Sequence, residues 1–175
     1  MTDPVHVLPY DPAWPAEFGA LAAPIRAALG DLGLGVEHVG STSVPGLSAK
    51  PVIDLVAVIS SRLVLPAVLE RLAGLGYVHR GDLGIPGREA FHWPGDRRHH
   101  LYVCAVGNAQ LHEFLLLRDF LRAHPEEAAA YGDLKTRLAE QYRHDRQAYS
   151  EAKTEFVRGV LARAAATASG LSLNP

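Results

Sequence analysis

A chain of 175 residues with 48% hydrophobic and 21% charged side chains has the composition of a globular protein that can bury one sizeable core. Its 17 basic and 19 acidic residues give a formal net charge of −2, which argues against a broad nucleic-acid-binding surface but leaves room for a local basic site. A single cysteine excludes an internal disulfide. Without a signal peptide or an apolar run near the roughly 20 residues of a membrane helix, we expect a cytoplasmic protein with no membrane partner.

The first predicted elements are a short edge strand and an amphipathic helix. Residues 5–8 are predicted as the strand. The helix is predicted to start at Asp11-Pro12, with aspartate as N-cap and proline in the first turn, and to end at "GDLGLG". Apolar side chains at helical spacing indicate that it buries one face. They are Trp14, Phe18, Leu21, Ile25 and Leu29.

Two strands separated by a loop are predicted next. Residues 36–39 read as a short strand, and residues 40–50 contain too many Gly, Ser and Pro residues for a strand or a long helix. Residues 51–59 have apolar side chains on both faces, which is typical of a central strand. "LPAVLERLAGLG" is predicted as a helix with a glycine stop, and "YVHR" as another short strand.

A hairpin and a helical segment complete the chain. Residues 89–93 and 99–106 flank "PGDRR" and are predicted as an antiparallel hairpin. From residue 111 to about residue 168 the pattern is helical, with breaks at Pro125 and near residues 143–145. We therefore expect an α+β fold in a single domain, residues 1–168. Its mixed-sheet core would span residues 1–108, its helical part residues 109–168, and a disordered tail residues 169–175.

Asp54 is the one charged side chain in the strand of residues 51–59. By the period of two it shares a face with Val56 and Val58. A carboxylate there is costly unless it is ion-paired, hydrogen-bonded or metal-bound. In the structural interpretation, Asp54 caps a loop or pairs with Lys50 or an arginine. In the functional interpretation, it serves a site formed with the preceding loop.

The loop "GSTSVPGLSAK" has the features of a phosphate cradle. Gly40 allows close approach of the backbone to a ligand, and Ser41 offers a hydroxyl beside backbone N–H groups. Lys50 adds a positive charge just before the strand. Asp54 would then hold a divalent cation against the same phosphates.

The stretch "VEHVGSTSVPGLSAKPVIDLVAVI" resembles the signature of the GrpB family. Further similar stretches are "PYDPAWPAEF", "HHLYVC", "LLLRDFLRAHPEEAAAYGDLKTRLAEQY" and "DRQAYSEAKTEFV", so the resemblance spans approximately residues 5–162. That family is similar to the nucleotidyltransferase superfamily, with its DNA polymerase β-like fold. The resemblance implies a nucleotidyltransferase-like mixed sheet flanked by helices, with the Gly-Ser motif beside a catalytic strand. Enzymes of the superfamily transfer a nucleotidyl group with two metal ions.

Against the superfamily pattern, Gly40, Ser41 and Asp54 match, whereas Val56 replaces the second acid of the strand. Two metal ions about 4 Å apart need several carboxylates to offset their charge, and one aspartate does not suffice. Two interpretations remain open. The site binds one metal ion, Mg²⁺ or Mn²⁺ with Zn²⁺ as the alternative, or it binds a phosphorylated ligand without transfer.

The hairpin and the first strand offer further candidates. If the second hairpin strand neighbours Asp54, His100 and Tyr102 would project where the third superfamily acid lies. His100 is thus a candidate metal ligand, with a hydrogen-bonded structural histidine as the alternative. Glu37 and His38 alternate on a strand, so only one of them faces the side of Asp54; for each, a structural role is the alternative.

The remaining candidates are basic or nucleophilic. Arg118 interrupts the apolar run "LLLRDFL", so it clamps phosphate or pairs with an acid. Lys135 and Lys153 are both predicted on helices, where most lysines lie on a solvated face. Only Lys153 is retained as a candidate site residue. His92 is a weaker counterpart of His100, and a solvated position is favoured for Arg88. Cys104 is expected to be buried and, like Ser41, is not proposed for covalent catalysis.

The sequence therefore predicts an enzyme or a binding module. The enzyme would transfer a nucleotidyl or phosphoryl group to an acceptor that the sequence does not identify, with Asp54 and Lys50 as catalytic residues and the metal ion on Asp54 and His100. Its phosphate- or nucleotide-binding residues would be Gly40, Ser41, Thr42, Ser43, Arg118 and Lys153.

The alternative is a degenerate member of the fold that binds a nucleotide or another small phosphorylated ligand. GrpB-like domains resemble the extra domain fused to dephospho-CoA kinase in some chains, which makes a coenzyme A-like ligand conceivable. A third interpretation is a scaffold in which Lys50 satisfies Asp54. The oligomeric state does not follow from the sequence.

Overall fold

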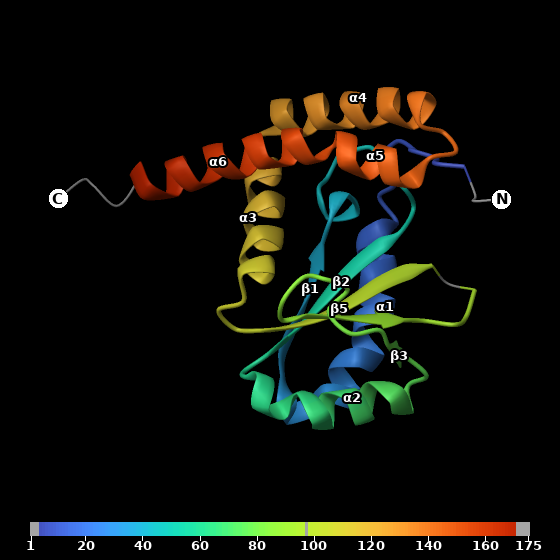
Figure 1. Ribbon diagram of the computed structural model, residues 1–175, viewed down its shortest axis with the longest axis vertical. Coiled ribbons are helices and arrows are strands. Elements are labelled where there is room, and N and C mark those ends of the chain that lie inside the picture. Colours follow the sequence, from blue (N-terminus) through green and yellow to red (C-terminus); the bar gives the residue numbers. More distant parts are fainter. Residues whose placement is uncertain (1–3, 97, 171–175) are drawn as a thin grey trace.

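The computed structural model describes residues 4–96 and 98–170, and within them a five-stranded mixed sheet has helices against both faces and across one end (Figure 1). The strands are β1 (Gly33–Val39), β2 (Ile53–Ile59), β3 (Val78–His79), β4 (Arg88–His92) and β5 (His99–Ala105). Their order is β1-β2-β5-β4-β3, in which β2 and β5 run parallel and the other neighbours antiparallel. The predicted α+β class, the mixed sheet and the hairpin, which is β4–β5, are confirmed.

The helices lie against both faces and at both ends of this sheet. They are α1 (Trp14–Leu29), α2 (Leu65–Gly74), α3 (Ala109–Ala123), α4 (Pro125–Gln141), α5 (Arg146–Ala152) and α6 (Thr154–Gly170), with short 3₁₀ helices η1 (Gly30–Leu32), η2 (Ser41–Ser43) and η3 (Arg62–Val64). In Figure 1, α4, α5 and α6 lie across the end of the sheet at which β2 begins, and α2 lies at the other end. The expected C-terminal helical segment is therefore present. It includes residues 169–170 of the expected tail, and residues 171–175 lie outside the described residues.

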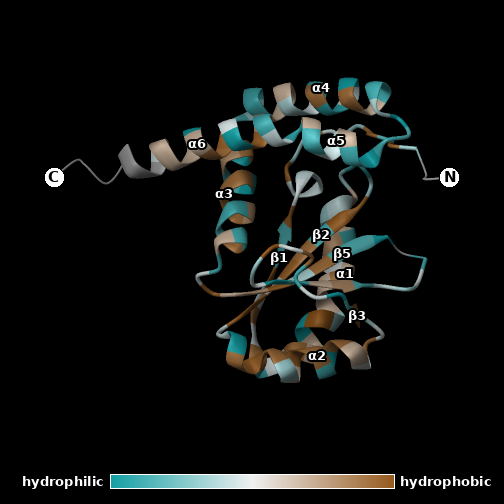
Figure 2. Cartoon of the chain, in the orientation of Figure 1, coloured by the Kyte–Doolittle hydropathy of each residue, from teal (hydrophilic) through white to brown (hydrophobic). Residues whose placement is uncertain are grey.

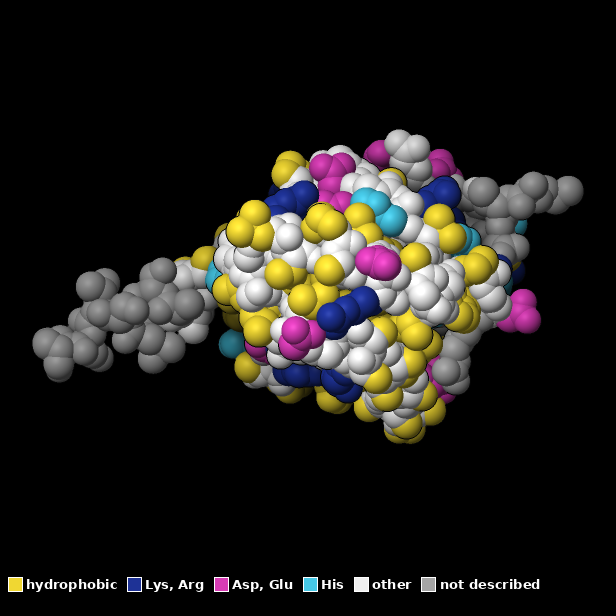
Figure 3. Space-filling model, turned by 90° about the horizontal axis from the view of Figure 1, so that it is seen from below, with side chains coloured by type: hydrophobic (Ala, Val, Ile, Leu, Met, Phe, Trp, Pro, Cys, Tyr) yellow, Lys and Arg dark blue, Asp and Glu magenta, His cyan; other side chains and the backbone are white. Residues whose placement is uncertain are grey.

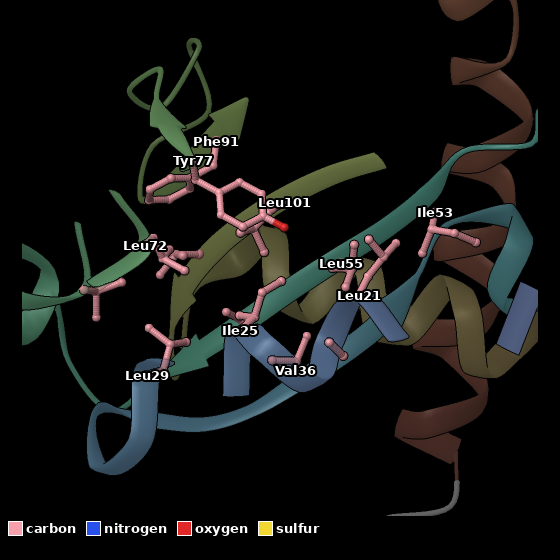
Figure 4. Packing of buried hydrophobic residues seen from close by; sticks show 14 of the residues in the cluster. Leu21, Ile25, Leu29, Val36, Ile53, Leu55, Leu72, Tyr77, Phe91 and Leu101 are labelled. Carbon is pink, nitrogen blue, oxygen red and sulfur yellow. The ribbon is translucent and has the colours of Figure 1, made fainter. Parts of the chain in front are cut away.

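The main core lies between α1, α2 and one face of the sheet. The apolar stripe predicted for α1 is buried there through Leu21, Ile25 and Leu29. Figure 4 shows these side chains beside Leu55 of β2 and Leu101 of β5, and in Figure 2 the hydrophobic colour follows β2 through the middle of the molecule. Full burial of one such side chain contributes about 1.5–3 kcal/mol. This layer therefore fixes β2 firmly in place.

The opposite face of the sheet packs against α3. Val39, Val56 and Cys104 form a second hydrophobic cluster there with Leu111 of α3. Burial raises the pKa of the Cys104 thiol to about 11, in keeping with a buried side chain that is not a nucleophile. Asp54 lies on the same face, two residues nearer the start of β2, where the helices α4–α6 approach.

The N-terminal segment and α1 differ from prediction at their starts. Residues 5–8 form no strand; their described pairing is one isolated bridge, between Leu8 and Ala49. The helix α1 begins at Trp14 rather than at Asp11. Asp11 instead closes the preceding turn, because its side chain and carbonyl both accept backbone N–H groups.

Two later boundaries also differ. β2 begins at Ile53, two residues later than predicted, because Pro51 has no N–H and the N–H of Val52 donates to the Lys50 carbonyl instead of the ladder. The helical segment breaks at Pro125 and near residues 143–145, as predicted, and a further break at Lys153 separates α5 from α6.

Within the described residues, we find no helix that combines the length and the apolar character needed to cross a bilayer.

Candidate functional site

A cleft of about 180 Å³ opens where the start of β2 meets α4, α5 and the junction of α5 with α6. The sheet, the η2 turn, the loop before β2 and the C-terminal helices all contribute to it. Its lining residues are Ser41, Thr42, Ala49, Lys50, Val52, Asp54, His100, Lys135, Arg146, Tyr149 and Lys153. The cleft thus brings together six of the residues singled out from the sequence, namely Ser41, Thr42, Lys50, Asp54, His100 and Lys153.

Asp54 faces this cleft rather than a closed interior. Its side chain is 27% exposed, and its Oδ1 accepts a hydrogen bond from His100 Nδ1 at 2.7 Å. The parallel register of β2 and β5 places the two residues directly opposite each other. This charge-assisted hydrogen bond compensates the half-buried carboxylate. Its partner is a histidine, not the Lys50 or arginine considered from the sequence.

Gly40 gives this carboxylate its room. Its φ is +72°, and a Cβ added there would overlap Asp54 Oδ2. The turn is held by Ser43, whose hydroxyl donates to the Gly40 carbonyl at 2.6 Å. The Ser43 carbonyl accepts N–H groups of Arg122 at 2.8 and 2.9 Å. Ser43 and Arg122 therefore position the turn without lining the cleft.

Three amines from separate segments, Lys50, Lys135 and Lys153, form what we call the lysine cluster. The Nζ atoms of Lys50 and Lys153 lie 4.6 and 4.2 Å from the centre of the same ring, that of Tyr149. Lys135 is only 2% exposed; its Nζ donates to the carbonyl of Ser48 and lies over an aromatic ring of α4. The cluster is thus built on the loop before β2, on α4 and on the end of α5.

Burial and mutual repulsion make these amines easier to deprotonate. Burial, followed by Lys153 and Lys50, lowers the pKa of Lys135 to about 7. Burial, followed by Lys50, lowers the pKa of Lys153 to about 8, and burial, followed by Arg146, lowers that of Lys50. Positive charge is therefore held in the cleft at a cost that a bound anion would relieve.

The end of the molecule at α2 has a different charge pattern. Figure 3 shows the end of the molecule at α2, away from the cleft, where hydrophobic, acidic and basic side chains are interspersed. With a net charge of −2 for the chain, the basic groups of the cleft are a local feature.

Arg118 lies elsewhere, in a bridge between α3 and β1. Its Nη1 donates to Glu37 Oε2 at 2.6 Å and to the carbonyl of His38 at 3.2 Å, and its Nε donates to Asp119 Oδ1 at 2.7 Å. Of the two roles weighed from the sequence, the structure contains the pairing with acids. Arg118 does not line the cleft.

Glu37 is the member of the Glu37–His38 pair on the side of Asp54, since it lies opposite Val56 in the β1–β2 ladder. His38 points to the other side, where its ring stacks on Phe18 at 4.6 Å and its Nε2 lies 3.0 Å from Thr42 Oγ1. Burial lowers the pKa of His38 to about 4, so the imidazole is neutral at physiological pH.

The remaining hairpin candidates lie outside the cleft. Tyr102 stacks on Phe114 at 5.8 Å, and the guanidinium of Arg88 lies 4.6 Å from the centre of the Tyr102 ring. Burial raises the pKa of Tyr102. His92 is exposed at the end of β4.

Apart from the apolar Ala49 and Val52, sequence reasoning missed three lining residues, Lys135, Arg146 and Tyr149. A signal for the first was present, because Lys135 is four residues after Tyr131 and three before Leu138, on the stripe of α4 that is buried. Arg146, Tyr149 and Lys153 recur at intervals of three and four residues, which puts them on one side of a helix.

The donor groups of the cleft do not fit a pair of metal ions. Among residues 4–96 and 98–170, no group of three or more His, Cys, Asp and Glu side chains is placed to hold a metal ion. Val56 is apolar and fully buried two residues after Asp54 on the same face of β2, and Glu37 opposite it is engaged by Arg118. Asp54 and His100 are the carboxylate and the imidazole that line the cleft.

Comparison with known proteins gives one family. A family model described as "GrpB protein" matches residues 4–163, close to the span expected from the sequence. A UPF0157 protein of Pseudomonas aeruginosa is 44% identical over 174 residues, which cover 94% of this chain and 69% of that protein. The crystal structure of the conserved protein GrpB from Enterococcus faecalis superimposes with a TM-score of 0.83 at 32% identity, covering 91% of this chain and 96% of the other.

Two more distant matches concern larger chains. A dephospho-CoA kinase of Mycolicibacterium paratuberculosis is 28% identical over 92% of this chain and 46% of its own length. The structure of Cid1 in complex with the UTP analogue UMPNPP matches with a TM-score of 0.44 at 13% identity, covering 83% of this chain and 46% of that chain. The latter likeness is too low to bear on function.

Proposed function

This chain belongs to the GrpB family, and from that premise we propose that its cleft binds a small phosphorylated ligand, with a nucleotide as the expected class. One observation carries the proposal. Four basic side chains line the cleft around the single carboxylate of Asp54; they are Lys50, Lys135, Arg146 and Lys153. Such an enclosed excess of positive charge favours a multiply charged anion.

The polar turn supports the same ligand chemistry. Ser41 and Thr42 line the cleft next to Gly40, whose lack of a side chain leaves space for the Asp54 carboxylate. Backbone N–H groups and hydroxyls of such a turn complement phosphate oxygens. The volume of about 180 Å³ suits a phosphate-bearing portion of a ligand better than a whole drug-sized molecule.

A thermal-shift series on the purified chain tests this proposal. The panel holds inorganic phosphate, nucleoside mono-, di- and triphosphates and dephospho-CoA, each with Mg²⁺, with Mn²⁺ and with a chelator. We expect concentration-dependent stabilisation by the phosphorylated compounds and none by the matching nucleosides. Lys50→Gln should abolish the shift, whereas Arg158→Gln, which removes an exposed charge on α6, should retain it. A lack of response to every phosphorylated compound contradicts the proposal.

Metal-assisted nucleotidyl or phosphoryl transfer is the second candidate, favoured by the Asp54–His100 pair at the cleft. One Mg²⁺ or Mn²⁺ ion on Asp54 and phosphate oxygens of the ligand is the arrangement that these donors allow, since Mg²⁺ commonly uses one or two carboxylates together with substrate phosphates. His100 would orient the carboxylate, and Lys50 would stabilise developing charge.

Turnover of labelled nucleoside triphosphate, with and without Mg²⁺, separates the two candidates. Asp54→Asn should abolish any metal-dependent product formation while the folded content stays unchanged. Equal turnover in Asp54→Asn and the parent chain rules out this role for the carboxylate. If the ligand binds but no product forms in any condition, only the binding function remains supported.

A further inference from the structure

The lysine cluster has a geometry that narrows the ligand further. Its three lysines line the cleft from three segments, the loop before β2, α4 and the end of α5. The Nζ atoms of Lys50 and Lys153 lie over one aromatic ring, and the Nζ of Lys135 donates to the carbonyl of Ser48. Donors that converge from separate directions suit a group with oxygens on several sides.

Resting on the proposed function, we propose that the lysine cluster receives the terminal, dianionic phosphate of the ligand and takes up a proton as that phosphate binds. A terminal phosphate offers three oxygens and a charge near −2 above its second pKa of about 6. A phosphodiester offers two free oxygens and a single charge. The cluster therefore distinguishes phosphate monoesters from diesters.

Desolvation is the physical reason for the proton uptake. Lys135 is almost fully buried, and the contacts described for its Nζ are a carbonyl and the face of Tyr131, which compensate an ammonium less well than an anion does. Without ligand, the amines repel one another and shed protons more readily. A dianion among them reverses both effects, so the amines become fully charged in the complex.

Charged and titratable groups from every neighbouring segment face the cluster. They are Asp54 and His100 from the sheet, Arg146 and Tyr149 from α5, and Tyr131 from α4. Asp54 favours the charged form of Lys153, and Arg146 disfavours that of Lys50. The carboxylate is the one negative charge among these, so the cluster has more ammonium groups than the cleft neutralises.

The pKa values of about 7 for Lys135 and about 8 for Lys153 set the working pH of a test. At pH 8 the phosphate monoester is already a dianion, so any proton taken up on binding enters the protein. The probes are methyl phosphate and dimethyl phosphate, which differ by one methyl group and one charge.

Isothermal titration calorimetry at pH 8 in two buffers of different ionisation enthalpy measures affinity and proton uptake together. We expect methyl phosphate to bind about tenfold tighter than dimethyl phosphate, with uptake of about one proton per site. Equal affinities, or heats that do not depend on the buffer, overturn the inference. The proposed function survives either result, because it requires only that phosphate binds. If none of the phosphates or nucleotides bind, both proposals fall.

Two variants locate the proton. Lys153→Arg keeps the charge but cannot titrate, so methyl phosphate should bind within about threefold of the parent with a smaller proton uptake. Lys135→Met should remove most of the remaining uptake and most of the preference for the monoester. Arg158→Gln, an exposed site on α6, should change neither. Proton uptake equal to that of the parent in Lys153→Arg and in Lys135→Met contradicts the assignment; if Lys135→Met does not fold, Lys153→Arg alone decides.

Discussion

Asp54 is tolerated on an apolar strand because each oxygen of its carboxylate has a distinct environment. Oδ1 accepts the His100 hydrogen bond at 2.7 Å, and Oδ2 lies against Gly40, where a side chain would collide with it. The strand therefore presents the carboxylate to the cleft while its flanking residues stay buried. The hydrogen bond from His100 satisfies one oxygen, and the missing Cβ of Gly40 leaves space for the other. Together they accommodate a carboxylate that would otherwise destabilise the sheet.

Replacement of Gly40 by alanine tests this close approach. Gly40 and Gly46 both have positive φ values, +72° and +79°, but an added Cβ meets Asp54 only at Gly40 and nothing within 4 Å at Gly46. Gly46→Ala thus reports the cost of backbone strain, about 1 kcal/mol. We expect Gly40→Ala to cost about 2 kcal/mol more in urea unfolding, because the turn or the carboxylate must move. Equal losses in the two variants argue against the contact.

Asp54→Asn makes a second residue-scale prediction, about charge. Asparagine keeps an oxygen for His100 but removes the negative charge from the cleft. In the presence of a chelator, we expect inorganic phosphate to bind about fivefold tighter to this variant, since one repulsive charge is gone. Calorimetry measures the affinity, and Asp133→Asn, an exposed position on α4, serves as the isosteric control. Unchanged or weaker binding in Asp54→Asn contradicts the electrostatic account.

Among the elements, α3 owes its attachment to the sheet partly to Arg118. The guanidinium joins α3 to the side chain of Glu37 and the backbone of His38, and its side chain is 12% exposed. Arg118→Met should lower the free energy of unfolding by about 2 kcal/mol, because a mostly buried guanidinium is removed from its hydrogen bonds to Glu37 and to the His38 carbonyl. Phosphate affinity should stay unchanged, since Arg118 does not line the cleft.

The matched control for Arg118 is Arg163→Met on α6. Arg163 pairs with Glu127 at 2.8 Å, but its side chain is half exposed. We expect a loss of no more than about 0.5 kcal/mol there. A large fall in phosphate affinity in Arg118→Met would instead support the phosphate-clamp role considered from the sequence.

Local pattern was enough to predict most elements, because their signals are local. The stripe from Trp14 to Leu29 has the spacing of a helix and lies against the sheet in the structure. β3 and the hairpin were found from short apolar runs between turns. What failed depended on partners or on a single backbone group. Residues 5–8 lack a strand to pair with, and no proline or glycine at Lys153 indicates in the sequence that the helix breaks there.

The cleft was only half predictable, for a similar reason. Ser41 and Asp54 belong to one continuous motif, and His100 follows from the pairing of β5 beside β2. Lys135 and Arg146 come from helices about 80 to 90 residues later in the chain, and their place opposite the motif depends on how α4 and α5 pack across the sheet. Until that packing is known, a buried lysine on a helix cannot be distinguished in the sequence from a solvated lysine.

At the scale of the whole molecule, the cleft lies between two parts of the chain that contribute different groups to it. The sheet contributes the carboxylate and the polar turn, and the C-terminal helices contribute two of the three amines. A bound anion would therefore link the sheet to α4 and α5 through charge. Without ligand, the same amines are a source of instability, because they are charged and enclosed.

The stability of the ligand-free protein should consequently rise from pH 7 to pH 9. Lys135 and Lys153 have folded-state pKa values of about 7 and about 8, against 10.5 when unperturbed. In this window the unfolded chain binds more protons than the folded one, so deprotonation favours folding; below pH 7 the penalty is present in full. His38, with a pKa of about 4, and Tyr149, with a pKa of about 12, titrate outside the window in the folded state.

Urea unfolding across this window measures the effect. The two amines should together add about 3–4 kcal/mol between pH 7 and pH 9, and Lys135→Met should remove more than half of that rise. Saturating inorganic phosphate should flatten the profile of the parent chain, because the bound anion keeps the amines charged at both pH values. A profile that is flat or falling without ligand, or one that runs parallel in Lys135→Met, means that these amines are not held charged at a cost. In that case the anion has nothing to relieve, and the cleft loses the physical basis for binding it.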